Sequence, residues 1–145
     1  MQEVLTRLSS ACEHGDPLEV QELFVEHAVL ETVFCSAGRD EPLPTSLSGA
    51  EAIGRSLTRQ QSRPSAWTHH STHDYIVQAL GDFGRVDAQF LLIGMVAGSG
   101  AAGSPAAAAL EVIEAGSYHA DLRRTSDGWK IWSLRVSRTL RYPFE

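Results

Sequence analysis

Apolar residues near the start of the chain recur at three- and four-residue spacing, which places them on one face of a helix. This first predicted helix ends near Gly15, and its apolar face consists of Val4, Leu5, Leu8, Ala11 and Cys12. Asp16 is a suitable N-cap for a second helix, with Pro17 in its first turn and Glu19 completing a capping box. The buried stripe expected for this second helix is Val20, Leu23 and Phe24.

The next segment predicts a strand, a loop and a third helix. Residues 29–34 favour a short strand, whereas the Gly/Pro/Ser-rich residues 36–48 are typical of a loop. Ser48 and Glu51 form a second capping box, so we expect a helix that ends before Pro64.

Beyond Pro64 the helical spacing gives way to runs of β-branched and aromatic residues. These runs predict four strands, at residues 67–77, 85–96, 110–123 and 129–138. Turn signals separate them at Gly81-Asp82 and Asp127-Gly128. Helices followed by strands, without alternation, favour an α+β fold with helices on one face of a strongly curved antiparallel sheet.

Residues 98–108 interrupt this pattern, because they comprise only Gly, Ala, Ser and Pro. We expect a mobile loop that serves either as a neutral linker or as a lid over a pocket. The chain of 145 residues is otherwise predicted to form a single domain, 1–145, around one core.

Composition limits the possible partners. With 18 acidic and 12 basic residues and no Lys/Arg run, the chain lacks the basic surface that nucleic acid requires. The longest strongly apolar stretch, residues 90–97, is far shorter than the roughly 20 residues that span a bilayer. The acidic N-terminus has no signal-peptide pattern, so we expect a cytoplasmic protein without a membrane partner. Cys12 and Cys35 lack metal-ligand spacing and are predicted to be buried thiols.

Four short motifs occur in order along nearly the whole chain, within residues 13–24, 48–53, 69–82 and 116–131. Together they resemble the SnoaL-like polyketide cyclases of the NTF2-like superfamily, whose relatives include ketosteroid isomerases, scytalone dehydratase and ring-hydroxylating dioxygenase small subunits. The resemblance implies a cone of sheet and three N-terminal helices around one pocket for a hydrophobic polyketide. It also implies a homodimer through the exposed face of the sheet, and we expect no cofactor.

Two positions depart from the family pattern. His73 stands where many members have asparagine. Ala120 stands where many members have a carboxylate, two residues after the tyrosine of the Gly-x-Tyr strand. Asp121 follows one residue later, so a regular strand points it to the opposite face unless a bulge shifts the register. The usual catalytic carboxylate is therefore expected to be absent.

The candidate catalytic residues are His69, His73 and Tyr118. His69 and His73 alternate onto one strand face with Ser71 and Tyr75, so they either supply an acid/base pair to the pocket or bond to backbone. Convergence of the two histidines with a carboxylate would make a metal site, but no metal motif is present and none is predicted. Tyr118 occupies the family's pocket-facing position and either donates to a ligand carbonyl or bridges core and rim.

Other residues are assigned by alternation and composition. His70 and Asp74 have the opposite parity to His69 and are predicted to face solvent. A solvated face or dimer surface is predicted for five arginines: Arg123, Arg124, Arg135, Arg138 and Arg141. Substrate-binding candidates are aromatic, apolar and acidic strand residues: Glu31, Phe34, Trp67, Tyr75, Phe90, Leu92, Glu114 and Trp132.

Two classes of function follow. The first is a cofactor-free cyclase that closes a ring, such as an indane, in a linear polyene by intramolecular [4+2] cycloaddition, because a shaped pocket accelerates such a reaction by positioning. Proton-transfer chemistry with a histidine base, as in an aldol-type cyclase, isomerase or dehydratase, is the alternative within this class. The second class is a non-catalytic binding or accessory subunit, since this fold also serves proteins without catalytic activity.

Overall fold

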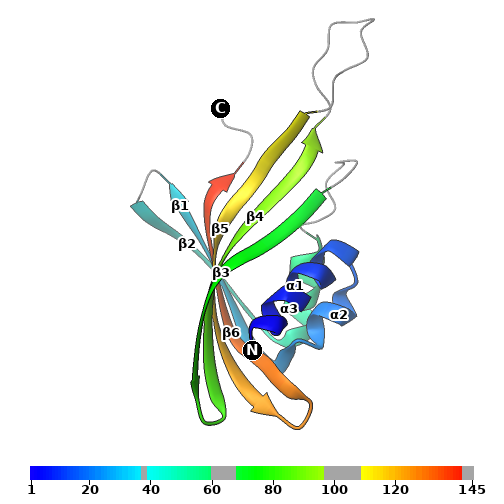
Figure 1. The fold of residues 1–145 in the computed structure, drawn as a ribbon, viewed down its shortest axis with the longest axis vertical. Coiled ribbons are helices and arrows are strands. Elements are labelled where there is room, and N and C mark those ends of the chain that lie inside the picture. Colours follow the sequence, from blue (N-terminus) through cyan, green and yellow to red (C-terminus); the bar gives the residue numbers. More distant parts are fainter. Residues whose placement is uncertain (37–38, 60–67, 97–108, 142–145) are drawn as a thin grey trace, which may run out of the picture.

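The computed structural model describes residues 1–36, 39–59, 68–96 and 109–141 (Figure 1). Trp67 and the predicted mobile loop 98–108 lie outside these ranges. The described residues form, in order, α1 (Gln2–His14), α2 (Pro17–Gln21), β1 (Phe24–Ser36), β2 (Arg39–Ser48), α3 (Ala50–Arg59), β3 (Thr68–Leu80), β4 (Phe83–Val96), β5 (Ala109–Thr125) and β6 (Gly128–Arg141).

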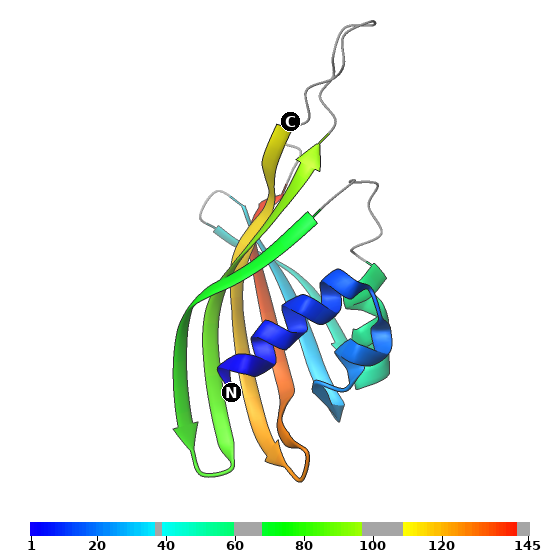
Figure 2. The same ribbon diagram turned by 45° about the vertical axis from the view of Figure 1, so that its right-hand side comes forward.

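The strands form one six-stranded sheet in the order β2-β1-β6-β5-β4-β3. The sheet is strongly twisted, and the helices cover one of its faces (Figures 1 and 2). The predicted α+β fold with a curved sheet is confirmed. The sheet is nevertheless mixed, because β1 runs parallel to β6 whereas the other neighbours are antiparallel.

The prediction of a loop at residues 36–48 was wrong, because β2 occupies most of this segment. β2 pairs with β1 from Val29 opposite Ser48 to Ser36 opposite Arg39, with an irregularity between Thr32 and Phe34. Its two prolines fall in this irregular part of the ladder. An edge strand tolerates proline there because a missing N–H breaks no central hydrogen bond.

The junction between α1 and α2 follows the sequence signals at Gly15 and Asp16. Gly15 adopts a left-handed conformation, with φ of 72°, and ends α1. The carboxylate of Asp16 accepts a hydrogen bond of 2.9 Å from the backbone N–H of Leu18 at the start of α2. Glu19, expected to complete a capping box with Asp16, bonds instead to His14 Nδ1 at 2.9 Å. Phe24, expected in the second helix, instead begins β1.

We expect Asp16→Ala to lower the free energy of unfolding by about 1 kcal/mol, because the first turn of α2 loses its N-cap acceptor. Urea denaturation followed by circular dichroism measures the change. Asp16→Ser is the control, since serine also caps helices and should restore most of the loss. Equal stability of the alanine variant and the unmodified protein would contradict the assignment.

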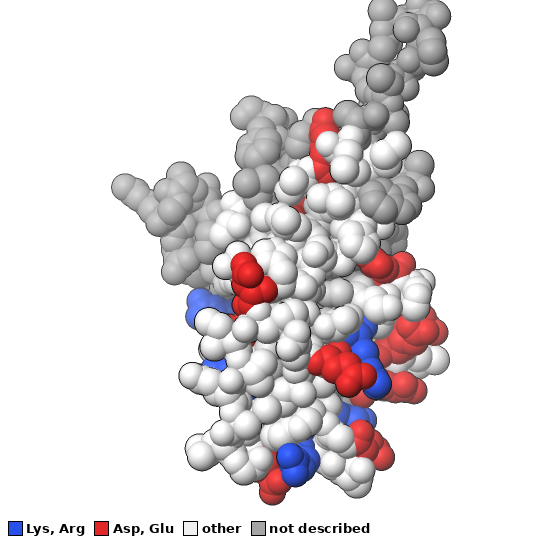
Figure 3. Space-filling model, viewed as in Figure 1, with Lys and Arg blue, Asp and Glu red and all other residues white. Residues whose placement is uncertain are grey.

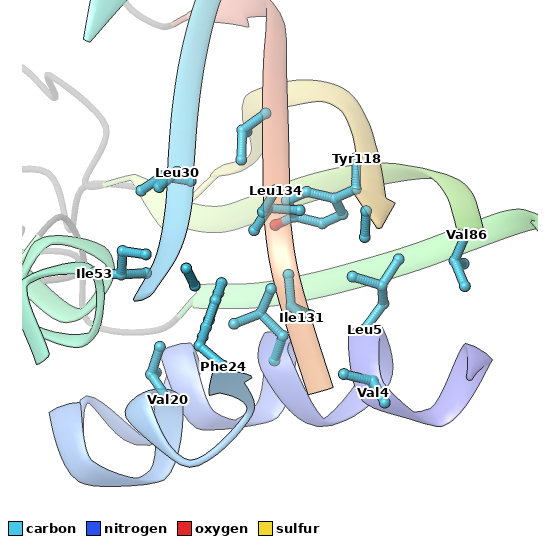
Figure 4. Close-up of a cluster of buried hydrophobic side chains, with 14 of the residues drawn as sticks. Val4, Leu5, Val20, Phe24, Leu30, Ile53, Val86, Tyr118, Ile131 and Leu134 are labelled. Atoms are coloured by element: carbon cyan, nitrogen blue, oxygen red, sulfur yellow. The ribbon is translucent and has the colours of Figure 1, made fainter. Parts of the chain in front are cut away.

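One hydrophobic cluster joins the helices to the inner face of the sheet (Figure 4). Its side chains come from all three helices and from strands β1, β4, β5 and β6; among them are Leu5, Val20, Leu30, Ile53, Val86, Ala120, Ile131 and Leu134. Alternation along β5 puts Tyr118, Ala120 and Leu122 on this inner face, and all three are buried.

The opposite, outer face of the sheet carries charged side chains in cross-strand pairs. Arg85 Nε donates to Asp121 Oδ1 at 2.8 Å, and His119 pairs with Asp87. In Figure 3, the Lys and Arg side chains on the visible face are few, and several adjoin Asp or Glu.

Within the described residues, no helix is both long and apolar enough to cross a membrane.

Candidate active site on the inner face of the sheet

Three rings from neighbouring strands form a cluster on the inner face of the sheet. The Tyr118 ring on β5 stacks on Phe90 of β4, with centroids 4.7 Å apart. The His70 ring on β3 lies 5.3 Å from the Phe90 ring, and its Nε2 is 3.0 Å from the Tyr118 hydroxyl. A phenol and an imidazole therefore share a hydrogen bond against an apolar wall.

A glycine makes room for this cluster. Phe90 lies opposite Gly116 in the ladder between β4 and β5. A Cβ atom at Gly116 would lie 2.9 Å from the Phe90 ring and 2.0 Å from the backbone oxygen of Ser137. Phe90 can therefore lie across β5 only because position 116 has no side chain.

Burial keeps both polar groups of the cluster uncharged. It lowers the pKa of His70 from 6.5 to about 4, an effect that Glu13 opposes and Arg138 reinforces. Burial also raises the pKa of Tyr118 well above its ordinary value. At neutral pH the pair is therefore a phenol and a neutral imidazole. The Nδ1 atom of His70 is buried and has no hydrogen-bond partner among the described residues.

A buried ion pair lies on the same face. Arg138 Nη1 on β6 donates to Glu114 Oε2 on β5 at 2.8 Å, and the two side chains are only 13% and 12% exposed. The Arg138 guanidinium also lies 5.8 Å from the centre of the Phe34 ring on β1. The opposite charges of Arg138 and Glu114 balance, so this pair adds polarity to the inner face without a net charge.

The sequence prediction for Arg138 was wrong, since this arginine is not on the solvated face. Leu134 and Val136 are buried on the inner face, and Arg138 continues their alternation along β6. That parity was the available signal. The prediction placed all five arginines on one surface because they are interleaved with apolar residues, although Arg135 and Arg138 have opposite parity on β6.

The orientation of β3 also differs from the prediction. His70 and Thr72 face inward, whereas the His69 side chain is 53% exposed and lies 3.5 Å from Glu13 Oε1. The His73 side chain is 38% exposed and lies 3.1 Å from Asp74 Oδ2. His70 and Asp74 were both expected to face solvent. Asp74 is exposed as expected, whereas His70 supplies the buried imidazole.

A β-bulge is the physical reason for this difference. The register between β3 and β4 shifts between His73 and Ile76, and Asp74 has a positive φ of 54°. The bulge reverses the alternation, so Thr72 and Tyr75 both reach α1 although they are three residues apart. Strict alternation backward from Tyr75 therefore assigns the wrong histidines to the inner face.

Of the predicted substrate-binding residues, several lie on or near the inner face. Phe90 and Glu114 belong to the groups described above, Phe34 contacts Arg138, and Leu92 pairs with His70 in the ladder. Tyr75 packs against the core and bonds to Thr6. Their roles in binding stay predictions.

Two other substrate-binding candidates lie elsewhere. The Glu31 side chain is 46% exposed and lies 3.8 Å from Arg135, so it is not a buried carboxylate. Trp132 is 39% exposed, because a register shift in the β5–β6 ladder turns Ile131 rather than Trp132 toward the core. Asp121 points outward to Arg85, as its parity predicted, so Ala120 occupies the inner position of the family carboxylate.

Residues of α1 complete the surroundings of the cluster. Glu13 accepts a hydrogen bond from the backbone N–H of His70. Cys12 is buried as predicted, and burial raises the pKa of its thiol to about 12. The described residues contain no group of three or more His, Cys, Asp or Glu arranged to hold a metal ion.

The strand order and the helices on one face of the curved sheet make this an NTF2-like, cystatin-like fold. Residues 1–135 match the family model of the SnoaL-like domain. The chain therefore belongs to the SnoaL-like family, which includes cyclases, dehydratases and isomerases.

Solved structures show the same fold at low sequence identity. A protein from Streptomyces avermitilis, provisionally named a dehydratase of the NTF2-like family, has a TM-score of 0.66 and 23% identity over 96% of this chain and 93% of its own. A provisionally named scytalone dehydratase from Novosphingobium aromaticivorans has a TM-score of 0.69 and 15% identity over 99% of this chain and 86% of its own.

A third similar structure is the β subunit of a provisionally named aromatic-ring-hydroxylating dioxygenase, also from Novosphingobium aromaticivorans. Its TM-score is 0.71, with 10% identity over 96% of this chain and 86% of that one. Comparison with curated proteins found no match. At these identities the structural likeness establishes the fold alone.

Proposed function

We propose that this protein is a cofactor-free cyclase that closes a ring in a linear, largely apolar polyketide intermediate by intramolecular [4+2] cycloaddition. The supporting observation is the Tyr118 hydroxyl, which stays protonated, lies against Phe90 and bonds to the neutral imidazole of His70. Such a hydroxyl donates to a carbonyl conjugated with one of the reacting double bonds. This donation lowers the barrier without a proton leaving the enzyme.

The His70 imidazole can orient this donor. When Nε2 carries the ring proton, His70 donates to the Tyr118 oxygen, and the phenolic hydrogen is left to point at the substrate. Hydrogen bonds in such a chain polarise one another, so the phenol becomes a stronger donor. The rest of the acceleration comes from holding the polyene in its reactive fold. Each reduction of about 1.36 kcal/mol in the activation free energy raises the rate tenfold.

The direct test is incubation of metal-stripped protein with a linear polyene that carries a diene and a carbonyl-activated dienophile. Chiral chromatography follows ring closure against a protein-free control. We expect faster closure to a single stereoisomer. Closure at the background rate, with the background mixture of isomers, would contradict the proposal and favour a binding or accessory role.

A second candidate function is proton transfer, as in a dehydratase or isomerase, with His70 as the base. It is favoured by the buried Nδ1 atom, which lacks a partner among the described residues, and by the low pKa of His70, which keeps the ring unprotonated. In this mechanism the imidazole itself removes a proton from the substrate. The two mechanisms therefore differ in whether His70 must be basic.

His70→Gln separates the two mechanisms. The glutamine amide can still donate to Tyr118 but cannot act as a base, so we expect a cycloaddition rate within about tenfold of the original. A base mechanism predicts a loss of roughly 10²- to 10⁴-fold. The substrates are the polyene above and a β-hydroxy ketone that can dehydrate.

The rate of ring closure is expected to be nearly independent of pH from about pH 5 to 8. The pKa of His70 is lowered from 6.5 to about 4 and that of Tyr118 is raised, so neither group ionises in this window. Because the folded-state pKa of His70 is the lower one, its neutral form stabilises the fold above pH 6.5, and this contribution is lost as the pH falls toward 4. Initial rates and thermal melting between pH 4 and 8 measure both effects. A rate that titrates near pH 6.5 would contradict the assignment of the site to two groups that do not ionise in this window.

A further inference from the structure

Side-chain hydrogen bonds join α1 to the edge strand β3. The donors and acceptors on α1 lie at residues 6, 9 and 13, a spacing that places them on one face of the helix. We call this set the α1–β3 seam; it consists of the bonds Thr6 to Tyr75 (3.0 Å), Ser9 to Thr72 (2.5 Å) and Glu13 to the backbone N–H of His70.

The Glu13 bond differs from the other two because its partner belongs to the candidate active site. Its acceptor is a carboxylate oxygen, and its donor is the backbone N–H of the residue whose imidazole meets Tyr118. The other seam bonds join side chains of residues outside the three-ring cluster. Of the three seam bonds, only that of Glu13 therefore connects α1 directly to the backbone of His70.

The position of His70 in the sheet explains why such an acceptor matters. β3 is the edge strand of the described sheet and pairs with β4 alone, so one side of its backbone has no neighbouring strand. The bulge between His73 and Ile76 further interrupts the ladder near His70. An ionised carboxylate is a strong acceptor for a backbone N–H, and it can fix a strand segment that the ladder holds from one side only.

We propose that Glu13 is a positioning residue for the His70–Tyr118 pair. By holding the backbone of His70, the Glu13 carboxylate keeps the imidazole within hydrogen-bond distance of the Tyr118 hydroxyl. The catalytic consequence rests on the proposed function, but the geometric role does not depend on turnover.

The charge of Glu13 has a separate, measurable effect. The groups that act on His70 are Glu13 on α1, His69 beside it on β3 and Arg138 on β6, together with its hydrogen-bond partner Tyr118 on β5. Glu13 raises the pKa of His70, whereas Arg138 and His69 lower it. Replacing the Glu13 carboxylate with an amide keeps an acceptor oxygen but removes the charge, so the pKa of His70 should fall.

The variants Glu13→Gln, Glu13→Asp and Glu13→Ala test the proposal on the free protein, labelled with ¹⁵N. The amide proton of His70 and the imidazole nitrogens report on the two hydrogen bonds. We expect Glu13→Gln to preserve both signatures and to lower the His70 pKa. Asp is one methylene shorter and Ala has no acceptor, so both should shift the amide proton upfield and alter the imidazole Nε2 signal.

Ser9→Ala is the matched control, because it removes the neighbouring seam bond without touching His70. We expect it to leave the His70 signals in place. Unchanged imidazole signals in Glu13→Asp and Glu13→Ala would overturn the proposal. So would the same change in Ser9→Ala, since the seam would then act only by docking the helix.

The rate of ring closure gives an independent readout. In Glu13→Asp, displacement of the imidazole should lower kcat by about tenfold and leave KM little changed. In Glu13→Gln, kcat should stay close to that of the unmodified protein. Equal rates in the unmodified protein, Glu13→Gln and Glu13→Asp would contradict the catalytic consequence. If the unmodified protein shows no ring closure, the proposed function fails, but the nuclear magnetic resonance data still decide whether Glu13 positions His70.

Discussion

Tyr118→Phe is expected to lower kcat/KM for ring closure by roughly a hundredfold, in the range found when one preorganised donor is removed from an active site. Phenylalanine keeps the ring that stacks on Phe90 and loses only the hydroxyl that bonds to His70. Among the described residues the buried imidazole would then lack a partner on both nitrogens, which should lower the free energy of unfolding by about 1–3 kcal/mol. Initial rates on the activated polyene, with thermal melting of the same samples, measure both effects.

Ser9→Ala is also a suitable control for this substitution, because it removes a buried hydroxyl that lies outside the three-ring cluster. We expect it to change stability without a comparable loss of rate. If Tyr118→Phe keeps the full rate, the hydroxyl does not donate to the transition state. Acceleration would then have to come from the shape of the site alone.

Gly116→Ala is expected to destabilise the protein by about 3 kcal/mol, at the upper end of the usual cost of overpacking. The new methyl group would lie 2.0 Å from the backbone oxygen of Ser137 and 2.9 Å from the Phe90 ring. A backbone oxygen in a neighbouring strand cannot turn aside as a flexible side chain can. Strands β5 and β6 must therefore separate locally, and the Phe90 ring must shift away from position 116.

The comparison with Gly81→Ala isolates this steric effect. Gly81 has a positive φ of 59°, and a methyl group added there would meet no described atom within 4 Å. The cost of Gly81→Ala is therefore that of backbone conformation alone, about 1 kcal/mol. Urea denaturation gives both values. If Gly116→Ala costs no more than Gly81→Ala, the β5–β6 ladder relaxes easily, and the glycine is not required for the ring cluster.

The sequence predicted the elements whose side chains follow one strong period. The apolar spacing of α1 and the long β-branched runs of β3 to β6 are confirmed, because burial of one face dictates both patterns. β2 was not predicted, since its proline- and serine-containing sequence has the composition of a loop. Only its place at the edge of the sheet, which is a tertiary property, makes those residues compatible with a strand.

The candidate site was predictable in part, for the same reason. Tyr118 was found through its position in the family motif, and Arg138 could have been found by its alternation with Leu134 and Val136. His70 was assigned to the wrong face. The bulge at Asp74 reverses the faces of β3, and an aspartate with positive φ leaves no distinctive mark in a single sequence.

The parallel pairing of β1 with β6 has a consequence for the order in which the protein can be made. Phe34, near the end of β1, lies beside Arg138, near the end of β6, so these two neighbours are far apart in the order of synthesis. During translation β1 emerges from the ribosome long before β6 exists, and until then it can pair only with β2. Closure of such distant contacts is slow. The inner face with its Arg138–Glu114 ion pair can therefore be completed only after β6 has left the ribosome.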